Sequence, residues 1–221
     1  MIRDALEIAK KDLLIEVRSK VLLNQLLPFV AVVLILFGFA VGTENRTLVD
    51  ISPGIFWVIA FLSALLAIQR SFSIEAENQA KDGLLAYGLE PGGIFLGKVA
   101  SIFFECIVVE VFLGLGVVFV YGMRLNSVAL LVVSAAFATL GVASVGTLFG
   151  ALAAATKVRE TLLPLLVLPS TAPVLLAVTK AWEDGISSRI GIGDPWLGLL
   201  VVFGLIYLAI GLVSFGSVLE D

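Results

Sequence analysis

Long uncharged stretches alternate with short charged segments along most of this chain. Five stretches contain no Asp, Glu, Lys or Arg, and a sixth is interrupted only by Glu105 and Glu110. The six stretches are residues 21–43, 51–69, 99–123, 125–156, 161–179 and 195–219. Because about 20 apolar residues rising about 1.5 Å each cross the hydrocarbon layer, every stretch predicts one transmembrane helix. The pattern predicts an all-α integral membrane protein in which residues 1–221 form a single six-span domain.

A different pattern precedes the first span. Its apolar residues recur at intervals of three and four positions, and they are Ile2, Leu6, Ala9, Leu13 and Val17. This spacing predicts an amphipathic helix over residues 2–18, with charged side chains on its other faces. We expect residues 1–20 to lie along the inner membrane interface and to lead into the first span. A solvated beginning of that span is the alternative.

The longest polar segment, residues 70–98, separates the second span from the third. We call this segment the excursion. Its candidate contact residues are Glu75, Glu77, Gly83, Leu84, Leu85 and Pro91. An apolar surface exposed outside the bilayer is typical of a docking site for another protein, so we expect a partner here. A helix that lies on the membrane surface is the alternative.

The composition supports the bilayer as the solvent of this chain. Hydrophobic residues make up 60% of it and charged residues 14%, against about 25% charged residues in a typical soluble domain. The net charge of −4 is spread over several loops, and no basic block indicates nucleic-acid binding. Residues 1–20 mix acidic and basic side chains and lack the apolar region of a cleavable signal peptide.

The sequence lacks the residues that several kinds of chemistry need. It contains no histidine, and its one cysteine, Cys106, lies in an apolar stretch, so we expect no disulfide and no metal site. Gly92, Gly97 and Lys98 have the spacing of a phosphate-binding P-loop, but Val99 replaces the required Ser or Thr and a membrane helix replaces the strand. We therefore expect no nucleotide site and no enzymatic activity in this chain alone.

The distribution of basic residues predicts the orientation in the membrane. With the N-terminus inside, ten Lys and Arg residues lie on inner segments and four on outer segments. Positive charge is enriched on the cytoplasmic side of membrane proteins. Because the number of spans is even, we expect both termini in the cytoplasm.

Glu105 and Glu110 lie within the third span. A carboxylate inside a membrane costs a few kcal/mol at least, so it usually faces protein or water and carries a function. Five positions apart, the two residues project about 140° from one another and do not form one paired site. We keep both as candidates for a pathway or a gate, against structural pairing or protonation. Lys98, seven residues before Glu105, is the expected partner of Glu105.

Three prolines interrupt the fifth span, at Pro164, Pro169 and Pro173. Each removes a backbone donor and disrupts one turn, so the sequence predicts a kinked helix. Broken helices in membranes lie inside protein or line a cavity, which makes these prolines candidates for a pathway or a gate. A kinked helix without such a role is the alternative.

Small and aromatic residues predict two further features. Gly146 and Gly150 place small residues on one helix face, which favours close helix contact within the chain or with a second copy. Trp57, Trp182 and Trp196 lie near the predicted outer ends of spans, where indole rings usually anchor at the headgroup level.

The order of these features resembles permeases of the type-2 ABC exporter class. Four stretches are similar to the haem exporter protein B family (CcmB), and the resemblance extends over the whole chain. They are residues 51–58 with Pro-Gly-Ile-Phe-Trp, 62–67, 72–98, and 166–173 with Leu-Pro-Ser-Thr-Ala-Pro. Gln69 departs from the family, in which Glu commonly precedes the arginine at position 70.

This resemblance implies the permease subunit of an ATP-driven complex in the bacterial cytoplasmic membrane. The complex delivers haem to the periplasmic side for c-type cytochromes. The implied partners are a CcmA-like ATPase that binds ATP and moves the excursion, CcmC-like and CcmD-like membrane subunits, and a CcmE-like haem chaperone. The haem-binding signatures of those partners are absent here, so we expect no cofactor bound directly to this chain.

Three other functions stay open at this point. In the first alternative, the chain is a mechanical subunit that couples ATP hydrolysis to release of a haem chaperone without transporting haem. In the second, it is a type-2 exporter permease for a lipid, a polysaccharide or a drug. The third alternative is a secondary transporter that uses Glu105 or Glu110 for proton coupling and needs no ATPase.

Overall fold

The computed structural model describes residues 1–41, 45–77, 89–123, 125–154, 156, 158–187 and 191–220. Its helices are α1 (Ile2–Ser19), the π-helix η1 (Leu22–Leu26), α2 (Leu27–Val41), α3 (Asn45–Glu77), α5 (Pro91–Tyr121), α6 (Val128–Ala154), α7 (Arg159–Ile186) and α8 (Pro195–Glu220). Six segments have the length and composition to cross a membrane. They are Leu22–Val41, Thr47–Ile74, Pro91–Tyr121, Val128–Ala154, Thr161–Ile186 and Pro195–Val218. The predicted all-α, multi-pass membrane fold is confirmed, including a helix ahead of the first span.

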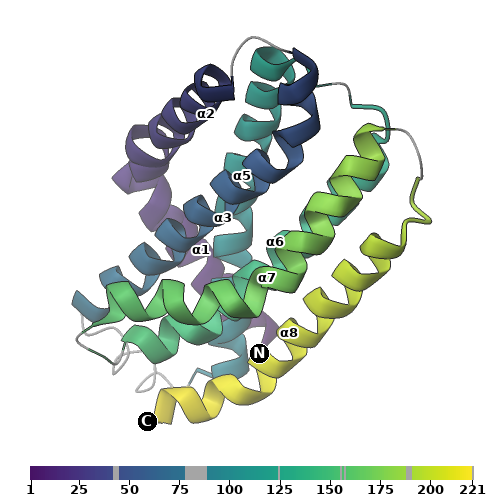
Figure 1. The fold of residues 1–221 in the computed structure, drawn as a ribbon. Helices are drawn as coiled ribbons and strands as arrows, with labels where there is room; N and C mark the ends of the chain where they lie inside the picture. The colour runs from purple at the N-terminus through teal and green to yellow at the C-terminus, as the bar shows by residue number, and fades with distance from the viewer. Residues whose placement is uncertain are drawn as a thin grey trace.

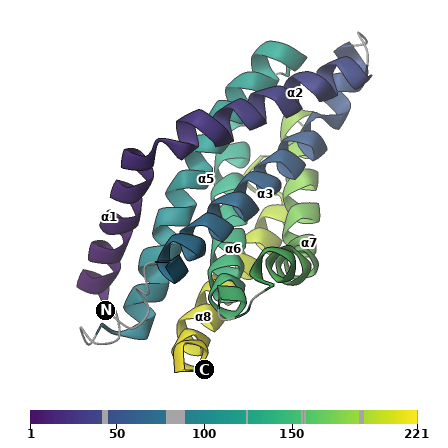
Figure 2. The same cartoon turned by 90° about the vertical axis from the view of Figure 1, so that its left-hand side faces the viewer.

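Both termini lie at the same end of the helix bundle, as Figures 1 and 2 show. The C-terminal end of α3 and the N-terminal end of α5, which flank residues 78–88, lie toward that end too. This arrangement fits an even number of spans. The side of the membrane on which the termini lie stays a prediction.

A break in helical geometry separates α1 from the first span. Lys20 adopts a left-handed conformation with φ of 55°, and the π-helix η1 follows. Figure 2 shows the chain changing direction between α1 and α2. Glu16 Oε1 accepts a hydrogen bond from the Leu22 backbone N–H at 2.8 Å, so a side chain satisfies a donor that the break exposes.

Helix α3 is the centre of the bundle and packs against α2, α5, α6 and α7. In the most apolar stretch of α3, 72% of the residues are buried inside the protein, against 17% in that of the first span. Gly146 and Gly150 on α6 allow α3 to approach closely, since an added Cβ would lie 2.2 Å from Ile68 Cδ1 and 2.5 Å from Phe72 Cε2, respectively. These small residues therefore serve a helix contact within the chain.

The prolines of the fifth span lie inside α7, which bends along its length in Figure 1. Hydroxyl side chains donate hydrogen bonds to backbone carbonyl groups of this proline-rich segment. The Tyr207 hydroxyl of α8 donates to the Ser170 carbonyl at 2.6 Å, and Thr171 Oγ1 donates to the Val167 carbonyl at 2.8 Å. Such bonds let a membrane helix tolerate proline. The predicted kink is confirmed, whereas a role in a pathway stays a prediction.

Two tryptophans lie in the interior and not at the membrane surface. Trp57 and Trp182 are 3% and 5% exposed, with ring centroids 5.5 Å apart. Both pack against Phe56, at centroid distances of 5.3 and 4.2 Å. The expectation that they anchor in the headgroups is wrong, because packing of α3 against α7 turns both indole rings inward.

Candidate functional site

Helix α1 lies lengthwise against the first half of α5, as Figure 2 shows. Glycines on α5 make this contact close. A Cβ added at Gly97 would lie 2.6 Å from Ile8 Cβ and 2.7 Å from the Ala5 carbonyl oxygen. A Cβ added at Gly93 would lie 2.9 Å from the Met1 carbonyl oxygen. Because backbone atoms cannot move aside as a flexible side chain can, these positions require glycine for α1 to lie here.

The face of α1 with Ile8, Asp12 and Glu16 is turned toward the protein, and several apolar residues of the predicted stripe are turned outward. Ile2, Leu6 and Val17 are 71%, 67% and 73% exposed, whereas Ile8 and Glu16 are buried. An outward apolar stripe on a membrane protein is available to lipid. Its position at the membrane interface stays a prediction, but the structure places Asp12 and Glu16 on the inward face.

Arg70 of α3 joins α1 through two short hydrogen bonds. Its Nη1 donates to Glu16 Oε2 at 2.5 Å, and its Nη2 donates to Ser19 Oγ at 2.5 Å. The side chains of Arg70 and Glu16 are 21% and 10% exposed, so solvent screens this ion pair only in part. Removing one partner of such a pair leaves the other charge buried and uncompensated.

Lys98 of α5 makes a parallel connection. Its Nζ lies 3.4 Å from Asp12 Oδ2 and 3.3 Å from Ser71 Oγ, and 4.6 Å from the centroid of the Phe72 ring. The Lys98 side chain is 1% exposed, which is rare for lysine unless the ammonium group is paired. Lys98 therefore ties α5 to both α1 and α3.

Arg70 and Lys98 lie on opposite sides of residues 78–88, one shortly before that segment and one shortly after it. We call the group Asp12, Glu16, Ser19, Arg70, Ser71 and Lys98 the stem-contact site. The C-terminal end of α3 and the N-terminal end of α5 are the two helical stems of the excursion. Helix α1 thus contacts both stems. Any force that moves one stem relative to the other acts on these contacts.

The first turn of α1 makes weaker contacts with the beginning of α5. The Met1 amino group lies 2.8 Å from Glu90 Oε2 and 3.1 Å from Asp4 Oδ2. Hydrogen bonds to Glu90 and Asp4 raise the pKa of the amino group, and the bond to that amino group lowers the pKa of the Asp4 carboxyl. Water screens these exposed charges, so the buried pairs of the stem-contact site hold α1 more strongly.

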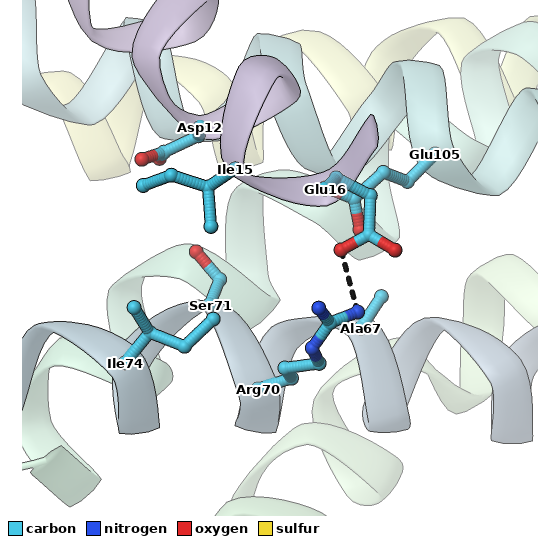
Figure 3. Close-up of a pocket in the computed structure, with 8 residues that line it drawn as sticks. All are labelled: Asp12, Ile15, Glu16, Ala67, Arg70, Ser71, Ile74 and Glu105. Atoms are coloured by element: carbon cyan, nitrogen blue, oxygen red, sulfur yellow. Dashed lines mark hydrogen bonds and ion pairs between the residues drawn. The ribbon is translucent and has the colours of Figure 1, made fainter. Parts of the chain in front are cut away.

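Glu105 faces a small cavity beside the stem-contact site. The cavity has a volume of about 30 Å³, and Figure 3 shows Glu105, Glu16 and Arg70 from three different helices around it. A water molecule needs about 10–15 Å³ and several polar partners, so this cavity is large and polar enough for water. Within the part of the chain that the structure describes, the Glu105 carboxylate has no hydrogen-bond partner in the protein.

Glu110 lies in different surroundings between α3, α5, α6 and α7. Thr139 Oγ1 donates a short hydrogen bond to Glu110 Oε1. The other oxygen, Oε2, is buried and has no hydrogen-bond partner among the described residues. A cavity of about 10 Å³ adjoins this carboxyl, and Trp57, Cys106 and Leu175 are among the residues that line it.

A protein-family model covers these helices and both carboxylates. The family described as "CcmB protein" matches residues 3–220. The chain belongs to the CcmB family.

Relatives from three bacteria carry the name "Heme exporter protein B". The protein of Haemophilus influenzae is 28% identical over 199 residues, which cover 90% of this chain and 88% of that protein. The protein of Pseudomonas aeruginosa is 28% identical, with 81% of each chain covered. The protein of Paracoccus denitrificans is 29% identical, with 86% of each chain covered.

The structure of this CcmB-family chain describes some of the predicted excursion residues. Glu75 and Glu77 belong to the last turns of α3, and Pro91 is the first residue of α5. Gly83, Leu84 and Leu85 lie outside the described residues. The predicted role of these six residues in contact with an ATPase stays a prediction.

The candidate pathway residues do not form one site. Glu105 and Glu110 face different cavities, and Pro164, Pro169 and Pro173 line neither of them. Lys98, the expected partner of Glu105, contacts Asp12 and Ser71 instead. This difference arises because α1 packs along α5, which brings the Asp12 carboxylate within 3.4 Å of Lys98.

Sequence reasoning missed the acidic residues of α1. Asp12 and Glu16 are four positions apart, so both lie on one helix face, and Ile8 extends the same row. That spacing was the available signal. It was overlooked because an amphipathic pattern is usually oriented by its apolar stripe, which here faces away from the bundle.

Proposed function

We propose that this chain is the transmembrane permease subunit of an ATP-driven complex for haem export and delivery to the periplasmic side in c-type cytochrome biogenesis. Three observations support the proposal: membership of the CcmB family, relatives named Heme exporter protein B, and six membrane-length helices. The observation that carries the coupling role is the contact of α1 with both stems of the excursion.

In this proposal a separate CcmA-like ATPase binds the excursion from the cytoplasm. ATP binding and hydrolysis on that subunit move the C-terminal end of α3 and the N-terminal end of α5. Arg70 and Lys98 then transmit the motion to α1, whose outward apolar stripe slides along lipid with little resistance. The chain supplies no nucleotide site, and its contribution is to convert the motion of the ATPase into motion of the spans.

The proposed complex also contains CcmC-like and CcmD-like membrane subunits and a CcmE-like haem chaperone, and it includes a second copy of this chain as a further candidate partner. Haem and ATP are held by the partners in this proposal. We place the complex in the bacterial cytoplasmic membrane, with both termini of this chain in the cytoplasm.

Replacing Leu84 and Leu85 with Asp tests the docking of the ATPase. The variant places charges in an apolar contact, at a cost on the order of several kcal/mol, so association should be lost while membrane insertion is retained. The measurement is the ratio of ATPase to permease after purification from detergent-solubilised membranes. Leu125→Asp, which changes an exposed leucine between the C-terminal end of α5 and the beginning of α6, is the matched control and should keep the wild-type ratio. A wild-type ratio in the Leu84/Leu85 variant would show that this docking site is wrong.

A mechanical role without haem transport is the second candidate function. The observation that favours it is the small size of the interior spaces beside Glu105 and Glu110, about 30 and 10 Å³. These volumes hold about two water molecules and one, respectively, whereas haem is a large macrocycle. In this arrangement of the helices neither intramembrane carboxylate adjoins a space for haem.

The side chains that ligate haem iron are scarce in this chain or already engaged. Proteins hold the iron with His, Cys, Met or Tyr, and the sequence has no histidine. The Tyr121 hydroxyl donates to the Leu34 carbonyl at 2.6 Å, Tyr207 is bound to Ser170, and Met123 Sδ accepts from Ser52 Oγ at 3.3 Å. We expect no stable haem ligation by the isolated subunit.

The visible spectrum of the purified subunit, after expression with ample haem, checks this expectation. The spectrum should lack a sharp Soret band after detergent washing, and the band should appear only with the CcmC-like subunit or the chaperone. A low-spin haem spectrum from the subunit alone would contradict the prediction and favour haem passage through this chain.

A further inference from the structure

We propose that Glu105 is the alternative acceptor for Arg70. In the structure Arg70 binds Glu16 of α1, and when α1 moves away from the bundle the guanidinium group turns to Glu105 of α5. Glu105 is thus a positioning residue that exchanges with Glu16. This inference rests on the proposed coupling role for its purpose, but its test needs neither an ATPase nor a cargo.

One cation and two carboxylates line a single cavity. Glu16, Arg70 and Glu105 line the same cavity of about 30 Å³ and come from α1, α3 and α5 (Figure 3). Glu16 and Glu105 are both buried. Because both carboxylates border one small cavity, Arg70 can change partner by a change of side-chain rotamer, without movement of the α3 backbone.

Arg70 has the hydrogen-bonding capacity for the exchange. A guanidinium group has five N–H donors in a planar fork, and its bonds in this site go to Glu16 and Ser19, both on α1. All these bonds are lost together if α1 moves away. The Glu105 carboxylate has acceptors to replace them, since it makes no hydrogen bond within the described part of the protein.

The charged residues around Glu105 explain why Arg70 has two possible partners, Glu16 and Glu105. Asp12 and Glu16 of α1 and Arg70 of α3 line the same cavity as Glu105. With α1 in place, Arg70 binds Glu16 and holds α1 against the bundle. With α1 displaced, both α1 carboxylates leave the cavity and Glu105 is the acceptor that remains for Arg70. A cation shared in this way spares the displaced state an uncompensated buried charge.

A set of variants in two backgrounds tests the exchange. Glu105→Gln is made in the wild-type chain and in the Glu16→Gln chain, and the thermal unfolding midpoint of each full-length protein is measured in lipid nanodiscs. In the wild-type chain Glu105→Gln should leave the midpoint unchanged or raise it, because repulsion from Glu16 is removed. In the Glu16→Gln chain, where Arg70 has turned to Glu105, the same substitution should lower the midpoint by about 2–4 °C.

Glu110→Gln is the matched control, since it makes the same substitution on the same helix away from Arg70. Its shift should be equal in both backgrounds. If Glu105→Gln in the Glu16→Gln chain does not fold, Glu105→Asp replaces it, because Asp keeps the charge but reaches one methylene less far and should lower the midpoint by a smaller amount.

Equal shifts for the Glu105 variants in both backgrounds would overturn the exchange, because a residue that only occupies space or avoids solvent does not depend on Glu16. The result is independent of the proposed transport function. Loss of ATPase association in the Leu84/Leu85 variant tests that function, and either experiment can fail while the other succeeds.

Discussion

Glu105 and Glu110 are the same residue type on the same helix, yet their surroundings differ. Glu105 borders a polar cavity with Glu16 and Arg70, at the junction of α1, α3 and α5. Glu110 is enclosed by four spans, and Thr139 is its one hydrogen-bond partner within the described residues. The first region contains several charges and contacts both stems of the excursion. The second contains one carboxyl group, mainly among apolar side chains.

The difference shows how one helix can serve two purposes along its length. Near its beginning α5 is part of an electrostatic contact that depends on α1. Further along, the same helix is part of the bundle interior, where Trp57, Val142 and Leu175 surround the carboxyl group. A contact held by charge can open and close at a moderate cost, whereas a packed interior resists change. We therefore expect motion at the Glu105 region and rigidity at the Glu110 region.

Removing Arg70 should have the largest effect on the charged region. Arg70→Gln leaves Glu16 and Glu105 facing each other without a cation, and the free energy of unfolding should fall by about 3 kcal/mol or more. The measurement is thermal unfolding in nanodiscs. Lys180→Gln is the control, because the side chains of its ion pair with Glu183 are 52% and 41% exposed and should contribute under about 1 kcal/mol. If the unfolding midpoints of Arg70→Gln and Lys180→Gln shifted by similar amounts, the buried ion pair of Arg70 would be no stronger than the exposed pair of Lys180.

Adding one methyl group to α5 should separate the α1 contact from the rest of the helix. Gly97→Ala places a Cβ against Ile8 and the Ala5 backbone, so it should displace α1 and destabilise the protein by about 1–3 kcal/mol. Gly114→Ala on the same helix meets nothing within 4 Å and should stabilise it by about 0.5–1 kcal/mol. Opposite signs in the unfolding midpoint are expected. A stabilising Gly97→Ala would mean that α1 does not lie on α5 in the membrane.

The smallest effects are expected at Glu110. Thr139→Val removes the one donor to its carboxyl group and should cost about 1 kcal/mol, whereas Glu110→Gln keeps an acceptor for Thr139 and should change the unfolding free energy by less. Chemical unfolding of the two single variants and the double variant measures the coupling between the residues. A loss of cytochrome maturation in Glu110→Gln at normal protein abundance would instead give this carboxyl group a functional role.

The sequence by itself determined that this protein lies in a lipid bilayer and how many times the chain spans it. Five uncharged stretches and a sixth that contains Glu105 and Glu110 became six membrane-length helices, and the prolines of residues 164–173 became a bent helix. These features depend on neighbours along the chain: the length of an apolar stretch, the spacing of its side chains, and the backbone donor that proline lacks. Family membership was also predictable, because it rests on local motifs distributed over the whole chain.

Only the tertiary structure decided which way the side chains face. Trp57 and Trp182 have the sequence positions of headgroup anchors but lie in the interior. On α1, Asp12 and Glu16 face the bundle while Ile2, Leu6 and Val17 face outward. The surroundings of Glu105 likewise depend on α1, whose Glu16 lies 89 residues earlier in the chain. Hydrophobic patterning specifies that a helix crosses or borders the membrane. In lipid both sides of a span can be apolar, so the pattern does not specify which side meets protein, and the packing of the helices decides it.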